Sequence, residues 1–181
     1  KKRVRVGVAG LRRGKGFVGV LAAHPGAQLV AVADRDAQVR DRIAAEFGLP
    51  RRCCDFDDLL REELDAVVIA TRHDSHARYV VQALERGKHV FVEKPLCLSR
   101  DELRAIETAA EASQGILMVG FNRRHSPLIA AMRAHFDGRT EPLAMIYRVN
   151  ALRIPLGSAA AWVHDPEVSG GRIVGEACHF I

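Results

Sequence analysis

The sequence is poor in aromatic residues and has no long apolar run. Phenylalanine, tyrosine and tryptophan make up 6% of the 181 residues, with one Trp and two Tyr. None of the Trp or Tyr residues lies within a basic cluster, which argues against stacking on single-stranded nucleic acid. No apolar run approaches the roughly 20 residues that a membrane-spanning helix needs. We therefore expect neither nucleic acid nor a membrane as a partner.

Cysteine is scarce, and its spacing excludes two common kinds of site. The four cysteines are Cys53, Cys54, Cys97 and Cys178, and no two of them form a Cys-x-x-Cys pair. The sequence thus predicts no zinc ribbon, no thioredoxin-type centre and no other metal site. We expect a reduced, cytoplasmic chain in which Cys53 and Cys54 fill a strand, and a redox role for this pair is the less favoured alternative.

Positive charge exceeds negative charge only modestly. The chain has 27 Lys and Arg against 22 Asp and Glu, a net charge of +5. Most charges alternate in sign, as on solvated helices, but two basic clusters stand apart. One contains Arg12, Arg13 and Lys15 within a glycine-rich turn, and the other is the pair Arg123 and Arg124. Both clusters suit an anionic small molecule better than a nucleic acid duplex.

Short apolar runs alternate with amphipathic segments along the chain, as in proteins that cover a parallel sheet with helices on both faces. This pattern predicts an α/β fold with a doubly wound Rossmann sheet over residues 1–122, and residues 123–181 are too few for a second complete domain. We expect strands at 3–9, 28–33, 51–54, 66–71, 89–92, 116–120 and 143–150, and helices beginning near residues 17, 39, 57, 77, 99 and 127.

A glycine-rich turn follows the first predicted strand. In a Rossmann fold, such a turn lets the backbone approach a diphosphate at the N-terminus of a helix. Gly10 and Gly14 fit this role, and Leu11, Arg12 and Arg13 lie between them. Arg12 stands where the second glycine of the usual G-x-G-x-x-G pattern would be, which makes the motif weak on its own.

An acidic residue ends the second predicted strand. Asp34 lies 24 positions after Gly10 and 20 after Gly14, where a carboxylate that binds the ribose of a dinucleotide is expected. A carboxylate here favours NAD, whereas Arg35 and the arginines of the turn would suit the additional phosphate of NADP. We expect NAD, with NADP as the alternative. The structural alternative is that Asp34 only caps the next helix.

Polar clusters follow three further predicted strands, at the edge where parallel sheets bind ligands. These clusters are Thr71-Arg72-His73-Asp74-Ser75-His76, Glu93-Lys94-Pro95 and Phe121-Asn122-Arg123-Arg124. Asp74 or Ser75 could instead cap a helix, either histidine could be structural, and Lys94 could be a surface lysine.

With these clusters the chain resembles the glucose-fructose oxidoreductase and inositol dehydrogenase (Gfo/Idh/MocA) family. The resemblance rests on residues 65–71, His76, 87–96, 120–124 and 170–179, taken in this order. The segment Trp162-Val163-His164-Asp165-Pro166 looks most like a branch fused behind a zinc-type alcohol dehydrogenase-like domain. We therefore expect sequence before Lys1 and after Ile181, and poor catalysis by the 181 residues alone.

The resemblance implies an NAD(P)-dependent oxidoreductase that moves hydride between a nicotinamide cofactor and a secondary alcohol of a sugar, inositol or sugar derivative. Lys94 would lie near the nicotinamide and the substrate, and His179 would transfer the proton. Substrate contacts would also come from Arg123 and Trp162. The cofactor contacts would be the glycine-rich turn with Asp34 and Arg35, and beyond it Thr71, Arg72, His73, His76, Glu93, Lys94 and Asn122.

The sequence departs from the family at the proposed proton-transfer site. Many members have Asp four residues before the histidine, whereas this chain has Gly175 there, and Glu176 could share a helix face with His179. Thr71-Arg72 replaces the usual Thr-Pro. The alternative to an enzyme is therefore a non-catalytic dinucleotide-binding sensor or scaffold. The family also implies that residues 123–181 are the incomplete start of an open-sheet α/β domain for substrate binding and oligomerisation, and that the full-length protein is a homo-oligomer.

Overall fold

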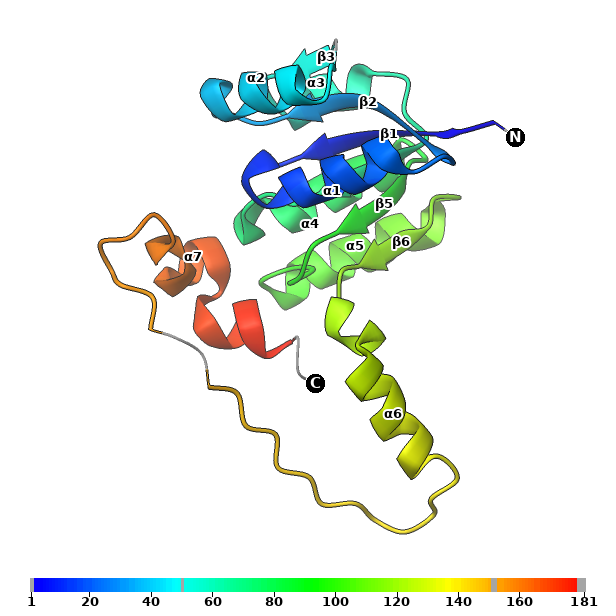
Figure 1. Cartoon of the computed structure of the whole chain (residues 1–181), viewed down its shortest axis with the longest axis vertical. Coiled ribbons are helices and arrows are strands. Elements are labelled where there is room, and N and C mark those ends of the chain that lie inside the picture. Colours follow the sequence, from blue (N-terminus) through cyan, green and yellow to red (C-terminus); the bar gives the residue numbers. More distant parts are fainter. Residues whose placement is uncertain (1, 50, 151–152, 179–181) are drawn as a thin grey trace. The chain divides into compact units, whose positions relative to one another are not determined.

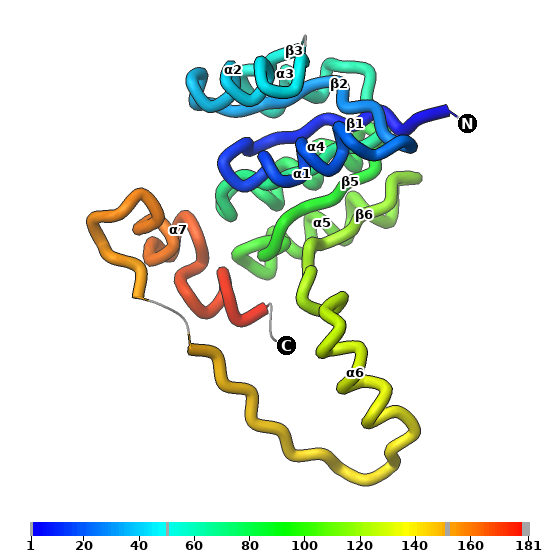
Figure 2. The backbone as a smooth tube through the Cα atoms, viewed as in Figure 1, coloured from blue at the N-terminus to red at the C-terminus, as the bar shows by residue number. Residues whose placement is uncertain are grey.

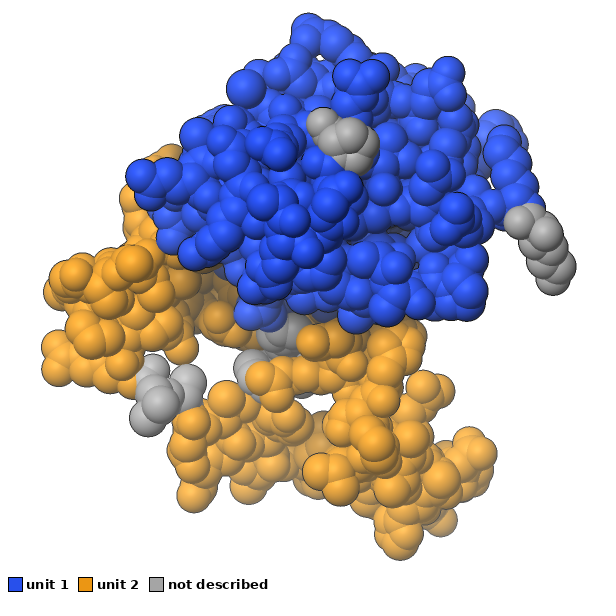
Figure 3. Space-filling model, turned by 45° about the horizontal axis from the view of Figure 1, so that its top comes forward, with its two compact units in different colours: residues 1–120 blue, residues 121–181 orange. Residues whose placement is uncertain are grey.

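The computed structural model describes residues 2–49, 51–150 and 153–178, and the chain forms two compact units. The first unit is Lys1–Gly120 and the second is Phe121–Ile181 (Figure 3). This division lies two residues before the predicted boundary between residues 122 and 123. Each unit is described here by itself.

The first unit is built on a six-stranded parallel sheet with the strand order β3-β2-β1-β4-β5-β6 (Figure 1). Parallel strands buried by helices on both faces read as apolar runs, which is why the runs in the sequence located most of them. The predicted doubly wound Rossmann sheet is confirmed. The strands are β1 (Val4–Ala9), β2 (Ala27–Ala33), β3 (Arg51–Cys53), β4 (Ala66–Ile69), β5 (His89–Val92) and β6 (Leu117–Val119).

Helices cover both faces of the sheet and form two cores. On one face, α1 (Leu11–Ala23) and α2 (Ala37–Glu46) pack around Val8, Val18, Val32 and Ile43. On the other face, the core joins the helices α3 (Phe56–Arg61), α4 (His76–Glu85) and α5 (Arg100–Ala112). Cys53 is buried in this second core, as expected for a residue that fills a strand, whereas the same expectation for Cys54 was wrong, because Cys54 lies just beyond β3 and is exposed.

Helix α1 begins six residues earlier than predicted. The sequence suggested a loop from Gly10 to Gly16, but Gly10 alone makes the turn, and the helix begins at Leu11. Gly10 can do this because its φ of 84° lies in the left-handed region that glycine enters without strain. Gly14 is then inside the helix, where a Cβ would come within 3.1 Å of Val8 Cγ1. Gly14 thus allows α1 to pack closely on the sheet.

The second unit is mainly helical in its described part. Its elements are η2 (Asn122–His125), α6 (Pro127–Phe136), η3 (Ala161–His164), α7 (Pro166–Ser169) and the π-helical turn Ile173–Ala177. Residues 143–150 were predicted to form a strand, and this was wrong, because they run as an exposed extended segment (Figure 2). A strand exists only with a hydrogen-bonded neighbour, and among the described residues none pairs with this segment.

Candidate functional site

The carboxyl ends of the strands form one edge, held together by the backbone. Beyond the ends of β1, β4, β5 and β6, the next amide donates to the last carbonyl of a neighbouring strand. Gly10 N donates to Ala33 O at 2.9 Å, and Ala70 N donates to Ala9 O at 2.8 Å. The amides of Glu93 and Gly120 bind Ile69 O and Val92 O in the same way, each at 2.8 Å. The glycine-rich turn after β1, Asp34 after β2 and the predicted polar clusters after β4 and β5 therefore lie along one edge, which we call the rim.

The turn from β1 to α1 brings backbone close to backbone at the rim. An ideal Cβ on Gly10 would lie 2.5 Å from Ala70 O and 2.6 Å from Thr71 N, so only glycine fits here. The first hydrogen bond within α1 runs from Gly14 N to Gly10 O at 2.8 Å. The amides of Arg12 and Arg13 come before this bond, where a helix has no carbonyl of its own to offer them. The first turn of α1, described in full, has no carboxylate. These features fit the diphosphate of a dinucleotide.

Asp34 joins the turns after β1 and β2. Its Oδ2 accepts a hydrogen bond from Leu11 N at 2.7 Å, and its Oδ1 accepts one from Asp36 N at 2.9 Å. The side chain that caps α2 is Asp36, whose Oδ1 accepts from Gln38 N and Val39 N. The alternative that Asp34 only caps this helix is therefore wrong, and its carboxylate is fixed at the rim.

Two arginines of the glycine-rich turn face carboxylates. Arg12 Nη2 lies 2.8 Å from Asp36 Oδ2, and Arg13 Nε lies 3.9 Å from Glu93 Oε1. Arg35, also a predicted cofactor contact, is exposed at the end of β2. Sequence reasoning missed the partnership of Arg12 with Asp36. The signal that could have found Asp36 was an acidic residue directly before a helical segment, a typical N-cap.

The polar cluster after β4 forms a short 3₁₀ turn, η1 (His73–Ser75), before α4. Thr71 Oγ1 lies 2.7 Å from Ser75 Oγ, and the Ser75 hydroxyl donates to Arg72 O at 2.7 Å. Ser75 precedes α4 but makes no side-chain capping bond to it. The hydroxyls instead hold the turn at the end of β4, so Thr71, Arg72 and His73 are placed together beside the glycine-rich turn.

His76 ties the ends of β4 and β5 together. It is fully buried, with Nδ1 2.7 Å from Pro95 O and Nε2 3.1 Å from Thr71 O. Burial lowers the pKa of His76 from its ordinary value of 6.5, against the effect of both carbonyls. A neutral imidazole has a single N–H, and the shorter distance favours Nδ1 as the donor. The contact of His76 with a cofactor stays a prediction, and the structure gives it a positioning role for the segment after Lys94.

This burial predicts a loss of stability in acid. The lowered pKa means that the unfolded chain binds a proton near pH 6.5 while the folded chain does not, so the free energy of unfolding should fall as the pH drops below about 6.5. His76→Asn should lower this free energy by about 1–2 kcal/mol at pH 8 through the lost hydrogen bond. Urea unfolding at pH 8, 6 and 5 tests this. Equal pH dependence in wild type and variant would contradict it.

Glu93 and Lys94 are buried at the end of β5. Their exposed fractions are 8% and 7%, so the alternative that Lys94 is a surface lysine is wrong. The peptide bond between Lys94 and Pro95 is cis. The segment then enters α5 through the predicted capping box of Ser99 and Glu102, which is confirmed. A lysine ammonium held inside the rim can stabilise negative charge that develops on a bound oxygen.

The remaining predicted site residues belong to the second unit. Asn122 and Arg123 lie in η2, Trp162 lies in η3, and Glu176 lies in the π-helical turn next to the buried Gly175. π-Helical turns are frequent at functional sites. His179 lies outside the described residues, so its pairing with Glu176 stays a prediction. Asp165 caps α7, and Ser169 donates to Val163 O at 2.9 Å, so local hydrogen bonds fold this segment.

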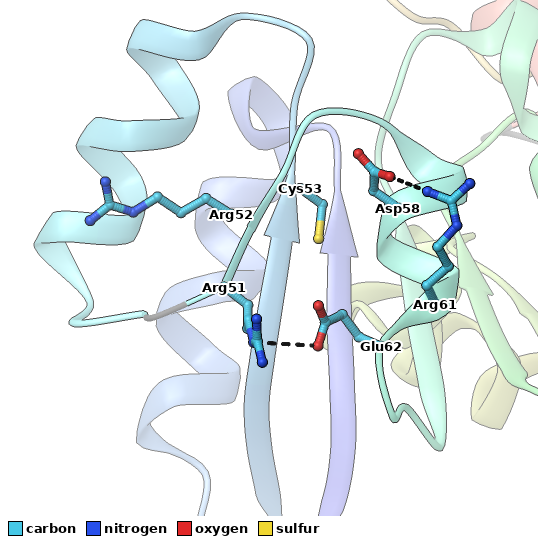
Figure 4. A pocket seen from close by; sticks show the side chains of 6 residues that line it. All are labelled: Arg51, Arg52, Cys53, Asp58, Arg61 and Glu62. Atoms are coloured by element: carbon cyan, nitrogen blue, oxygen red, sulfur yellow. Dashed lines mark hydrogen bonds and ion pairs between the residues drawn. The ribbon is translucent and has the colours of Figure 1, made fainter.

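A hollow on the surface lies between β3 and α3, and its charges pair with one another. It is lined by Arg51, Arg52, Cys53, Asp58, Arg61 and Glu62. Arg51 and Glu62 point toward each other at 3.7 Å, and Asp58 pairs with Arg61, whereas Arg52 points away (Figure 4). Burial raises the pKa of the Cys53 thiol to about 11. A thiol of this kind is not a reactive centre, so we keep the candidate site at the rim.

Comparison with known proteins identifies the family of the chain. Residues 4–121 match the model of the Gfo/Idh/MocA oxidoreductase family, described as having an NAD-binding Rossmann fold. The chain belongs to this family. The matched range contains the whole rim, from the glycine-rich turn to Gly120, so the members of the Gfo/Idh/MocA family share the part of the chain that forms the candidate site.

Several members of the Gfo/Idh/MocA family are similar to this chain over most of its length. The inositol 2-dehydrogenase of Rhizobium meliloti is 37% identical over 145 residues, which are 79% of this chain and 44% of that protein. The scyllo-inositol 2-dehydrogenase (NAD(+)) of Bacillus subtilis is 34% identical, covering 75% and 40%. The crystal structure of a putative myo-inositol dehydrogenase from Sinorhizobium meliloti superposes with a TM-score of 0.77 at 30% identity, covering 97% and 52%. The chain thus spans less than half of these two curated relatives.

Proposed function

We propose that this chain forms the dinucleotide-binding part of an NAD-dependent oxidoreductase acting on a secondary alcohol of a sugar, inositol or sugar derivative. The observation that carries the proposal is the rim, where the Asp34 carboxylate, the Gly10 turn and the buried Lys94 follow β2, β1 and β5 of one parallel sheet. A dinucleotide that crosses this edge would meet all three. The similarity to inositol dehydrogenases supports the class of substrate.

The cofactor would lie with its diphosphate on the turn and its adenosine ribose beside Asp34. At Gly10 the backbone would approach the diphosphate closely, and the residues up to Gly14 would supply amides at the start of α1. Thr71, Arg72 and His73 follow β4, and Glu93 and Lys94 follow β5, which suits contacts toward the nicotinamide half. Asn122 would add a contact from the second unit. The fixed Asp34 carboxylate favours NAD over NADP, because it repels an additional phosphate on the ribose.

The protein's part in the reaction would be to orient the alcohol and to manage its proton and charge. The bound nicotinamide supplies the hydride acceptor. The Lys94 ammonium would stabilise the developing alkoxide. His179 would take the hydroxyl proton, with Glu176 next to it as a partner for the imidazole. Arg123 and Trp162 would contact the substrate.

A non-catalytic sensor is the second candidate, and the observation that favours it is Gly175. Many members of the family have a carboxylate at this position, one helical turn before the histidine, and this chain has none there. A protein that lacks the proton-transfer machinery could still bind the dinucleotide at the rim. Binding and catalysis therefore have to be measured separately.

The test begins with binding. We expect calorimetric titration of the chain with NAD to give a Kd between about 1 µM and 1 mM, the range in which enzyme KM values usually lie. Asp34→Ala should weaken binding about tenfold, since it removes a charge-assisted hydrogen bond to the ribose. No binding of NAD or NADP by the wild-type chain at millimolar concentration would refute the proposal.

Catalysis is tested in the longest form of the protein that its gene encodes. Inositols and hexoses supplied with NAD should raise the absorbance of reduced cofactor. Cofactor binding without reduction by any polyol would favour the sensor. The sequence of the same gene would show whether a zinc-type alcohol dehydrogenase-like domain precedes the chain. We include this domain in the proposal because residues 162–166 resemble the branch of the family that has it.

The proposal extends to the setting of the protein. We place it in the cytoplasm as a homo-oligomer, following the family resemblance and the absence of disulfides among the described cysteines. In the described part of the chain, no helix has both the length and the apolar character that a bilayer crossing requires. Size-exclusion chromatography with light scattering on the longest form tests the oligomeric state.

A further inference from the structure

Arg12 departs from the dinucleotide-binding pattern, and its side chain leaves the turn it belongs to. It occupies the position of the usual second glycine. Its guanidinium reaches across to the start of α2, where Nη2 lies 2.8 Å from Asp36 Oδ2. The Arg12 side chain is 74% exposed, so packing does not force this direction. The carboxylate of Asp36 is what holds it.

Asp36 is suited to bind a cation. Its Oδ1 accepts hydrogen bonds from Gln38 N at 3.1 Å and Val39 N at 3.2 Å, which leaves Oδ2 directed at Arg12. The amide of Val39 and the charge of Arg12 lower the pKa of Asp36. The carboxylate is therefore ionised at neutral pH and can pair with the Arg12 guanidinium.

The pair lies beside the carboxylate expected to bind the adenosine ribose. The Asp34 carboxylate accepts one hydrogen bond from Leu11 N and another from Asp36 N. Because Leu11 directly precedes Arg12, Asp34 is tied to both sides of the Arg12–Asp36 pair. A phosphate on this ribose would come next to Asp34 and within reach of Arg12. The other arginine of the turn, Arg13, faces Glu93. Arg12 is thus the cation of the turn closest to the ribose site.

We propose that Asp36 is a specificity-determining residue, which favours NAD over NADP by holding Arg12 away from a ribose phosphate. The inference rests on the proposed function, because it assumes a dinucleotide at the rim. Asp34 repels the phosphate of NADP, and Asp36 withholds the guanidinium that would otherwise attract it. Without Asp36, a turn with arginine in place of glycine would favour the phosphorylated cofactor.

The decisive variant is Asp36→Asn. Asparagine caps helices as well as aspartate does, so α2 keeps its N-cap while the negative charge that binds Arg12 is removed. We expect the Kd for NADP to fall about tenfold, the value of one charge-assisted contact to phosphate. The Kd for NAD should change less than about twofold, because NAD has no phosphate there. Calorimetry with each cofactor measures both values.

A double variant separates the release of Arg12 from the simple loss of a negative charge. Asp36→Asn combined with Arg12→Gln should return the Kd for NADP to within about twofold of the value for Arg12→Gln alone, since the guanidinium that Asp36→Asn releases is no longer present. If the double variant keeps the gain, or if Asp36→Asn leaves the ratio of the two Kd values unmoved, the proposal is overturned.

Failure of this inference is distinguishable from failure of the proposed function. A wild-type chain that binds neither cofactor refutes both, whereas one that binds NAD with a selectivity indifferent to Asp36 refutes only the role of Asp36. Thermal unfolding of each variant checks its fold. If Asp36→Asn does not fold, Asp36→Ser, which also caps helices, takes its place with the same expected results.

Discussion

Gly10→Ala is expected to lower the free energy of unfolding by about 2–4 kcal/mol, from the cost of a left-handed residue together with overpacking. The φ of Gly10 is 84°, and the added Cβ would lie 2.5 Å from Ala70 O. The obstacle is backbone, which cannot rotate aside as a side chain can. Relief would have to come from moving the start of α1 away from the end of β4.

The same movement should abolish NAD binding, because the turn would no longer present its amides to a diphosphate. Urea unfolding measures the stability, and calorimetry with NAD measures the binding. Gly16→Ala is the matched control on the same helix. Nothing lies within 4 Å of a Cβ at Gly16. Alanine there should stabilise the helix by up to about 1 kcal/mol. If the Gly10→Ala chain were as stable as wild type and bound NAD as tightly, the close approach of the Ala70 and Thr71 backbone to Gly10 would be disproved.

The second large effect is expected at Lys94. Lys94→Met keeps the length of the side chain and removes its charge. In the longest form of the protein, kcat for polyol oxidation should fall about 10²–10³-fold, the usual effect of losing one group that stabilises an oxyanion. The Kd for NAD should change by no more than a few-fold. Steady-state kinetics and calorimetry on the same preparation separate the two.

Lys88 provides the control for this experiment, because it lies at the other end of β5. Its Nζ donates to Leu64 O at 2.8 Å. Lys88→Met should cost about 1 kcal/mol of stability through the lost hydrogen bond and leave kcat unchanged. If Lys94→Met weakened NAD binding strongly and kept kcat, Lys94 would be a cofactor ligand without a part in the chemistry.

The sheet could be predicted from the sequence because its strands are buried on both faces. Runs such as 66–70 are apolar throughout, since helices cover either side, and this signal is local. The position of Asp34 at the end of β2 was also readable, because a fixed spacing from the glycine-rich turn belongs to the dinucleotide-binding unit. The capping box of Ser99 and Glu102 is local as well, and it formed as expected.

Other features depend on contacts that the local sequence does not contain. The helix start at Leu11 follows from the backbone of Ala70 lying against Gly10, 60 positions along the chain. The roles of Arg12 and His76 are likewise set by distant partners, Asp36 and Pro95. Residues 143–150 have the composition of a strand, but composition cannot supply a neighbouring strand. Each of these predictions was wrong or incomplete because the feature depends on a tertiary contact.

The four backbone hydrogen bonds along the rim have a consequence for how this site can evolve. Amides and carbonyls at these positions are common to nearly all amino acids, so the support that holds the rim does not depend on side-chain identity. A replacement such as arginine for glycine at position 12 can therefore persist while the loops keep their places. Selection for a new cofactor or substrate could exchange the side chains along this edge one at a time and leave the sheet beneath them intact.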